Sequence, residues 1–163
     1  MTLYVNGTNG ISADGVNWVL GTTSLGTYEL KQKPSFDVAS STSVAASAVQ
    51  SFNTVYFNNG GWFSTTTGRF TAPVAGGYFF TCSSIKSTAA TTTVVRLYLR
   101  KNGVIQYNSR HYRMSETATA GYGEGSCSWL LDLNANDYVE VWVGAGASHA
   151  STQYTWFTGF LLG

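Results

Sequence analysis

The chain is poor in charged residues and in cysteine. Lys, Arg, Asp and Glu make up 10% of its 163 residues, against about 25% in a typical soluble domain. The net charge of +1 gives no electrostatic basis for binding nucleic acid or an anionic membrane. Two cysteines, Cys82 and Cys127, are too few for a disulfide scaffold or a four-ligand zinc site. Thr, Ser, Gly, Asn and Tyr replace charge, which is typical of a rigid β-rich protein.

Targeting and membrane-spanning segments are missing too. The first ten residues have neither the basic nor the apolar region of a secretory signal. No run approaches the ~18 apolar residues of a membrane span. We therefore expect a protein that is made soluble inside a cell, whatever its final location.

Motifs for catalysis are also missing. There is no Gly-x-Ser-x-Gly elbow, phosphate loop or dinucleotide fingerprint, and the eight carboxylates form no obvious pair in sequence. A pair assembled by folding stays open. His111 and His149 each lack a second His at ligand spacing and are interpreted as surface or hydrogen-bonded residues. We predict no catalytic residue, no cofactor, no metal site and no enzymatic activity.

Aromatic residues recur at intervals through residues 51–82, with turn residues between them. The breaks lie at 58–61 and 73–77, where Asn, Gly and Pro gather. This pattern predicts short strands that fold back on one another, and no window of useful length has helical spacing. The predicted strands cover 35–40, 49–57, 62–63, 69–71, 76–86, 94–101, 104–113, 126–133, 137–143 and 153–162. The fold class is all-β, a sandwich or jelly roll.

Two local signals refine this picture. Asn102-Gly103 separates two alternating runs and is the strongest hairpin signal in the chain. Residues 1–33 differ in character, because Asn-Gly and Asp-Gly pairs break them into short apolar pieces. We predict an N-terminal arm or small β-element at 1–33 and one jelly-roll domain at 34–163, with the boundary at Lys33-Pro34.

Three predicted strands are apolar on both faces. They contain residues 78–80, 129–131 and 156–162. A two-layer sandwich covers one face of each strand, so the other face needs a partner. We expect these strands to share one sheet whose outer face is an oligomer interface. The candidate interface residues are Tyr78, Phe80, Trp129, Leu131, Trp156 and Phe160.

The aromatic spacing resembles a known family signature. Phe52, Asn58, Phe63, Phe70, Gly76, Tyr78 and Phe80 match in register the signature of the globular head domain of complement component 1q, within the tumour-necrosis-factor-like jelly-roll superfamily. Cys82 stands where the pattern has a last aromatic. The similarity continues through 99–103, 131–139 and 157–162, and so spans about 34–163. It implies a ten-strand jelly roll that assembles as a tight trimer, in agreement with the doubly apolar strands.

The resemblance also bears on the cysteines and on the N-terminus. The family's topology makes the strands of Cys82 and Cys127 neighbours, which leaves either two buried core thiols or a cross-strand disulfide. Some relatives hold calcium near the trimer axis, but no Asp cluster marks such a site here. The collagen-like stem of the family is absent, and residues 1–33 stand in its place. Their sequence LYVNGTNGIS resembles short N-terminal segments of virion and tail-fibre proteins of bacterial viruses.

These observations predict a non-enzymatic, homotrimeric virion structural protein: a fibre tip, spike or capsid decoration made in the host cytoplasm. Residues 1–33 would attach it to other virion proteins, and loops 87–93, 115–125 and 144–152 would contact a host glycan or surface protein. The candidate receptor contacts are Tyr107, Tyr112, Tyr122, Trp142 and Tyr154, unless these aromatic residues pack in the trimer. The alternative is an extracellular protein, secreted or on a cell surface, with complement-like or cytokine-like recognition. A third reading is a glycan-cleaving enzyme.

Overall fold

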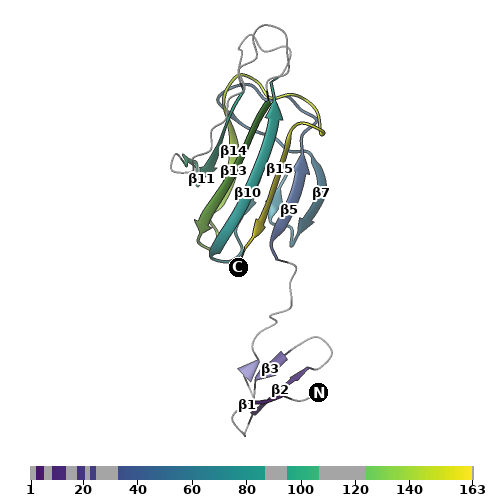
Figure 1. Ribbon diagram of the computed structural model, residues 1–163, viewed down its shortest axis with the longest axis vertical. Helices are drawn as coiled ribbons and strands as arrows, with labels where there is room; N and C mark the ends of the chain where they lie inside the picture. Colours follow the sequence, from purple (N-terminus) through teal and green to yellow (C-terminus); the bar gives the residue numbers. More distant parts are fainter. Residues whose placement is uncertain are drawn as a thin grey trace. The chain divides into compact units, whose positions relative to one another are not determined.

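The computed structural model describes residues 3–5, 9–13, 18–20, 23–24, 33–86, 95–106 and 124–162 (Figure 1). The chain divides into two compact units, Met1–Gln32 and Lys33–Gly163. The first unit holds a four-stranded antiparallel sheet in the order β1-β2-β3-β4. Its strands are Leu3–Val5, Asn9–Ala13, Trp18–Leu20 and Thr23–Ser24. Each strand pairs with the next along the chain, so the unit is a simple meander.

The second unit is a sandwich of two antiparallel sheets, and the predicted all-β class is confirmed. The five-stranded sheet has the order β13-β10-β15-β5-β7, and these strands lie side by side in Figure 1. They are Glu124–Leu133, Gly76–Ile85, Trp156–Leu161, Ser35–Ala39 and Thr54–Asn59. The six-stranded sheet has the order β12-β11-β14-β9-β8, with β6 also paired to β14. Its strands are Val104–Ile105, Arg96–Lys101, Tyr138–Ala145, Arg69–Thr71, Phe63–Ser64 and Ala48–Val49.

Aromatic rings fill the space between the two sheets. Phe36, Phe63, Phe70, Phe80 and Phe157 are each at most 4% exposed, and their ring centroids lie 4.9 to 6.3 Å apart. Burying one such side chain contributes about 1.5–3 kcal/mol. The aromatic repeat that predicted strands is therefore the repeat of the core.

Polar members of the same signature hold the turns. The side chain of Asn58 clamps Phe63 from both sides, because its Nδ2 donates to the carbonyl of Phe63 and its Oδ1 accepts from the amide of Phe63. The hydroxyl of the buried Tyr78 donates to the carbonyl of Val74 at 2.8 Å. A buried hydroxyl requires such a partner, so the Tyr at this position also fixes the preceding turn.

One predicted strand is wrong. Residues 49–57 were expected to form a single strand, but Val49 ends β6 in the six-stranded sheet and β7 begins at Thr54 in the five-stranded sheet. The chain crosses between the sheets where the amide of Gln50 donates to Val141 and the side chain of Asn53 bonds to Ser41. Alternation of apolar residues does not reveal such a crossing, because the same pattern suits either sheet. The crossing adds an eleventh strand to the ten expected.

Two turns rest on residues that accept positive φ. Asn102 and Gly103 have φ of 50° and 80° and join β11 to β12, which confirms the hairpin. Asn136, at the turn between β13 and β14, has a φ of 71°. Asn tolerates this conformation better than most residues other than Gly, which explains its place at this turn.

Candidate functional site

The outer face of the five-stranded sheet carries three apolar cross-strand neighbours. Leu130, Phe79 and Phe160 lie opposite one another on β13, β10 and β15, and we call them the apolar row. The rings of Phe79 and Phe160 are 5.6 Å apart. Leu130 is 65% exposed and Phe160 39% exposed. Large apolar side chains gathered on one face mark a contact surface.

The edge of the same sheet is apolar as well. Val55, Tyr56 and Phe57 on the edge strand β7 are 45%, 59% and 42% exposed. An edge strand presents unpaired backbone groups, and natural proteins usually protect such an edge with charge or cover it. No charged residue lies in β7. The edge therefore needs a cover, like the apolar row.

A polar row lies next to the apolar row on this face. Ser128, Thr81, Thr158 and Asp37 are cross-strand neighbours on β13, β10, β15 and β5. Ser128 Oγ donates to Thr81 Oγ1 at 3.1 Å, and Thr158 Oγ1 donates to Asp37 Oδ1 at 2.8 Å. The three hydroxyl groups therefore have hydrogen-bond partners within the protomer. The carboxylate of Asp37 carries a charge, which is costly to bury unless a partner pairs with it.

The candidate interface residues separate into two groups. Tyr78, Phe80 and Trp129 are 0%, 0% and 2% exposed and lie in the core, where they offer no surface to a partner. Leu131 packs against the same core, Trp156 is half-buried, and Phe160 belongs to the apolar row. Successive strand residues point to opposite faces. The outward positions on β10 and β13 are therefore Phe79 and Leu130, one residue away from the candidates on these two strands, whereas the candidate Phe160 on β15 does face outward.

The outer face of the six-stranded sheet is different in chemistry. Glu140 on β14 is paired to Arg69 on β9 and to Arg100 on β11, and it is 0% exposed. Arg69 Nε donates to Glu140 Oε2 at 2.8 Å, and Arg100 Nε lies 3.3 Å from Glu140 Oε1. The bond to Glu140 raises the pKa of Arg69. Two guanidinium groups thus share one buried carboxylate.

Aromatic rings hold both guanidinium groups in place. The guanidinium carbon of Arg69 lies 4.2 Å from the ring centre of Tyr138, and that of Arg100 lies 4.3 Å from that of Trp142. Arg100 Nε also donates to the carbonyl of Gly103 at 2.8 Å. Such cation–π contacts contribute about 0.5–2 kcal/mol each. We call these five side chains, Arg69, Arg100, Tyr138, Glu140 and Trp142, the arginine cluster.

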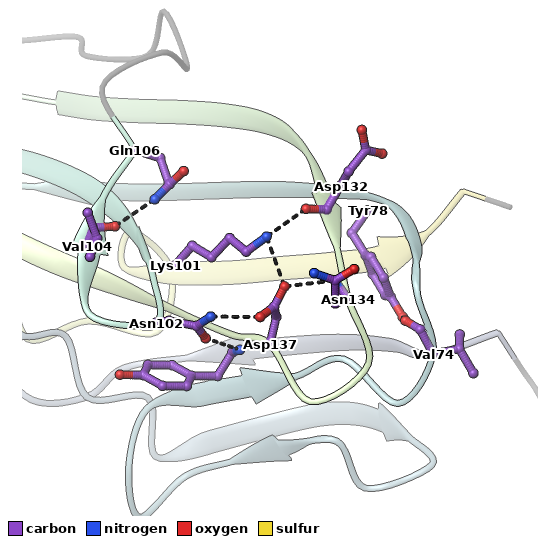
Figure 2. Close-up of polar contacts among 10 residues, drawn as sticks. Val74, Tyr78, Lys101, Asn102, Val104, Gln106, Asp132, Asn134 and Asp137 are labelled. Atoms are coloured by element: carbon purple, nitrogen blue, oxygen red, sulfur yellow. Dashed lines mark hydrogen bonds and ion pairs between the residues drawn. The ribbon is translucent and has the colours of Figure 1, made fainter.

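A third polar group, centred on Asp137, connects two neighbouring turns of the domain (Figure 2). Asp137 Oδ1 accepts from Asn102 Nδ2 at 2.7 Å, while its Oδ2 accepts from the amide of Asn134 and lies 2.9 Å from Lys101 Nζ. The contacts to Lys101 and Asn102 lower the pKa of Asp137 to about 2. This group joins the β11–β12 turn to the β13–β14 turn, which is a structural role.

The predicted loop 144–152 begins two residues later than expected, at 146, and it is anchored to other strand regions. β14 continues to Ala145, and the buried Ser148 pairs with Lys86 and accepts a hydrogen bond from the amide of Val44. Nearby, the ring of His149 lies 6.1 Å from that of Tyr154, which is 46% exposed. Ala147 and Ser148 are tied down because each forms an isolated bridge to another strand region.

The candidate receptor contacts do not form one site among the residues that can be placed. Tyr154 lies beside His149, whereas Trp142 is half-buried under Arg100 on the six-stranded sheet. Tyr107, Tyr112 and Tyr122, like loops 87–93 and most of 115–125, lie outside the described residues.

The two cysteines face each other directly. Cys82 on β10 pairs with Cys127 on β13, and both are buried thiols outside any disulfide bond. Burial raises the pKa of Cys82 well above its ordinary value, and the neighbouring Cys127 raises it further. A buried protonated thiol is unreactive, so the pair is a component of the core.

Metal chemistry finds no support in the parts of the chain that can be placed. Within residues 33–86, 95–106 and 124–162, His, Cys, Asp and Glu form no group of three that could hold an ion. None of the described segments contains a helix long and apolar enough to span a membrane.

Comparison with known proteins identifies the class of fold and then the family. The solved globular domain of zebrafish complement 1qA superposes with a TM-score of 0.62 at 21% identity, over 80% of this chain and 98% of that one. Murine APRIL superposes with a TM-score of 0.59 at 9% identity, over 80% of this chain and 100% of that one. These likenesses establish the jelly-roll fold of the complement 1q and tumour-necrosis-factor group.

The family follows from sequence. The model of the C1q domain matches residues 35–162, so the chain belongs to the C1q domain family. It is 36% identical over 112 residues to human complement C1q tumor necrosis factor-related protein 3, and 37% identical over 113 residues to the mouse protein. Each match covers 68% of this chain and 43% of the relative. The match thus spans less than half the length of these curated relatives.

Proposed function

We propose that this chain is a non-enzymatic recognition protein that works as a homotrimer. The observation that carries the proposal is the apolar row of Leu130, Phe79 and Phe160 on the outer face of a sheet whose edge, β7, is also apolar. A closed threefold ring joins two different patches of neighbouring subunits. In our proposal the β7 edge of one subunit covers the apolar row of the next.

Membership in the C1q domain family supports the trimer and also an extracellular location. Relatives named for complement C1q and tumour necrosis factor favour recognition outside the cell, in the complement-like or cytokine-like sense. We therefore place the extracellular role first. Three identical subunits raise avidity when each binds a repeated ligand weakly.

A matched pair of variants tests the trimer contact. Leu130 and Val104 are both 65% exposed, but Leu130 lies in the apolar row and Val104 lies on β12 in the other sheet. Leu130→Asp places a charge in the contact and should shift the protein to monomers in sedimentation velocity at micromolar concentration. Val104→Asp should remain trimeric. If both variants behave alike, the apolar row is not the contact.

The second candidate function is the virion appendage: a fibre tip, spike or capsid decoration. The observation that favours it is the separate unit Met1–Gln32, whose small meander suits an attachment element. Deleting residues 1–33 should leave a trimer that no longer joins the particle, measured by mass spectrometry of purified particles. Incorporation of the truncated chain would exclude this role for the arm.

A further inference from the structure

We propose that the arginine cluster binds an acidic glycan, a polysaccharide that carries carboxylate or sulfate groups. The proposal names a ligand class for the recognition role above, and it rests on that role through the position of the trimer contact. If the five-stranded sheet forms the trimer contact, the opposite sheet, which carries the cluster, stays uncovered in all three subunits.

The cluster has more positive charge than its structure requires. Two guanidinium groups share the single carboxylate of Glu140, so one positive charge is not compensated within the cluster. Both arginines use Nε for contacts inside the protein. Within the described part of the chain, the Nη groups of Arg69 and Arg100 form no hydrogen bond. These side chains are 40% and 21% exposed, so the Nη groups remain available to an oxyanion.

The two guanidinium groups are also held before any ligand arrives. Glu140 accepts a hydrogen bond from Arg69 Nε, whereas Arg100 Nε donates to the carbonyl of Gly103 and lies 3.3 Å from Glu140 Oε1. Tyr138 and Trp142 each lie against the planar face of one guanidinium group. A side chain that is already ordered loses less entropy on binding. The planar fork of arginine matches carboxylate and sulfate-like oxyanions with two parallel hydrogen bonds.

The surroundings favour a sugar polymer over nucleic acid. Tyr98, the cross-strand neighbour of Trp142, borders the cluster, and its ring occupies the space where a side chain at Gly144 would lie. Tyrosine combines an apolar ring with a hydroxyl, which suits the mixed surface of a sugar. Nucleic acid is bound through many phosphate contacts, whereas this chain has a net charge of +1 and the cluster holds two arginines. A polymer with spaced acidic groups fits this charge.

Binding of the full chain to labelled polymers at physiological salt tests the proposal. The probes are chondroitin sulfate, polygalacturonate, dextran sulfate, neutral dextran and double-stranded DNA. We expect binding to chondroitin sulfate, which carries both carboxylate and sulfate groups, and no binding to neutral dextran. We also expect binding to polygalacturonate, which carries only carboxylate groups, to dextran sulfate, which carries only sulfate groups, or to both. The comparison of these two polymers shows which anion the site prefers. The proposal is overturned if no acidic glycan binds, if neutral dextran binds equally well, or if DNA binds more tightly than every glycan.

Variants assign the binding to the cluster. Arg69→Lys and Arg100→Lys keep a positive charge beside the buried Glu140, so the fold should persist, but they lose the fork. Each should weaken glycan binding about tenfold, as expected for lost charge-assisted hydrogen bonds. Lys33→Gln is the control. It removes a full charge from an exposed residue that donates to the carbonyl of Leu162, just after β15 of the five-stranded sheet, and it should leave binding unchanged. A larger loss for Lys33→Gln than for the arginine variants would contradict the site.

Sedimentation of the same samples keeps the two proposals distinguishable. A trimer that binds no acidic glycan overturns the glycan site alone. A monomer that binds chondroitin sulfate through Arg69 and Arg100 overturns the trimer and supports the site.

Discussion

Gly159 on β15 lies between Phe80 on β10 and Phe36 on β5 in the five-stranded sheet, so a methyl group there should be costly. A Cβ added at Gly159 would lie 2.4 Å from Phe80 Cδ1 and 2.7 Å from Phe36 Cε1. Both rings are 0% exposed and pack against further aromatic rings, so they have little room to move. Overpacking of this kind costs about 1–3 kcal/mol. Replacing Gly with Ala offsets about 0.4–1 kcal/mol of it through the unfolded chain.

We therefore expect Gly159→Ala to lower the free energy of unfolding by about 1–2 kcal/mol. Gly77→Ala is the matched control in the same sheet, because its added Cβ would meet only Asp132 Oδ1, at 3.6 Å. It should leave stability unchanged or slightly higher. Urea unfolding at one fixed protein concentration measures both, since the stability of an oligomer depends on concentration. A Gly159→Ala protein as stable as the control would refute the packing described here.

Two further predictions concern ionisable groups. Because the pKa of Asp137 is lowered from 3.8 to about 2 in the folded protein, its contribution to stability is complete above pH 3.8 and is lost as the pH falls toward 2. Asp137→Asn should remove this part of the acid sensitivity in urea titrations between pH 4 and 2, and an unchanged pH profile would contradict the role of Asp137. Cys82 and Cys127 should both be alkylated only after unfolding, since both are buried and burial raises the pKa of Cys82. Rapid labelling of the native protein, or an intact mass that is two hydrogens lower without reductant, would show this description to be wrong.

Features decided by neighbouring residues could be predicted from the sequence. The Asn102-Gly103 hairpin needs two residues that accept positive φ, and both are in place at φ of 50° and 80°. The alternation in β11 and β14 likewise indicates which residues face the core. Leu97, Leu99, Val139 and Val141 are apolar and buried, and Arg, Tyr, Glu and Trp residues alternate with them. The family signature added the long-range pairing, which local pattern does not contain.

Features that depend on strand pairing could not be predicted. Tyr78, Phe79 and Phe80 are all aromatic, so alternation does not reveal which one faces outward; the pairing with β13 and β15 decides it. The arginine cluster depends on the register that brings Arg69 and Arg100 to opposite sides of Glu140, although these residues are up to 71 positions apart. The alternation in the sequence indicates that Arg100 and Glu140 face outward on β11 and β14, but it does not indicate that β9 brings Arg69 beside them.

The predicted virion role depended on the low charge of the chain and on residues 1–33, which lie outside the C1q domain at 35–162. The match to residues 35–162 and the relatives named for C1q and tumour necrosis factor favour the extracellular alternative. The jelly roll serves both roles equally well, because a fold alone does not define a function.

We propose that the five-stranded sheet closes a homotrimer, and sedimentation equilibrium of the unmodified chain at micromolar concentration is the decisive test. A homotrimer gives a single species of three times the 17.5 kDa chain mass. A single species with the mass of one chain would exclude this assembly.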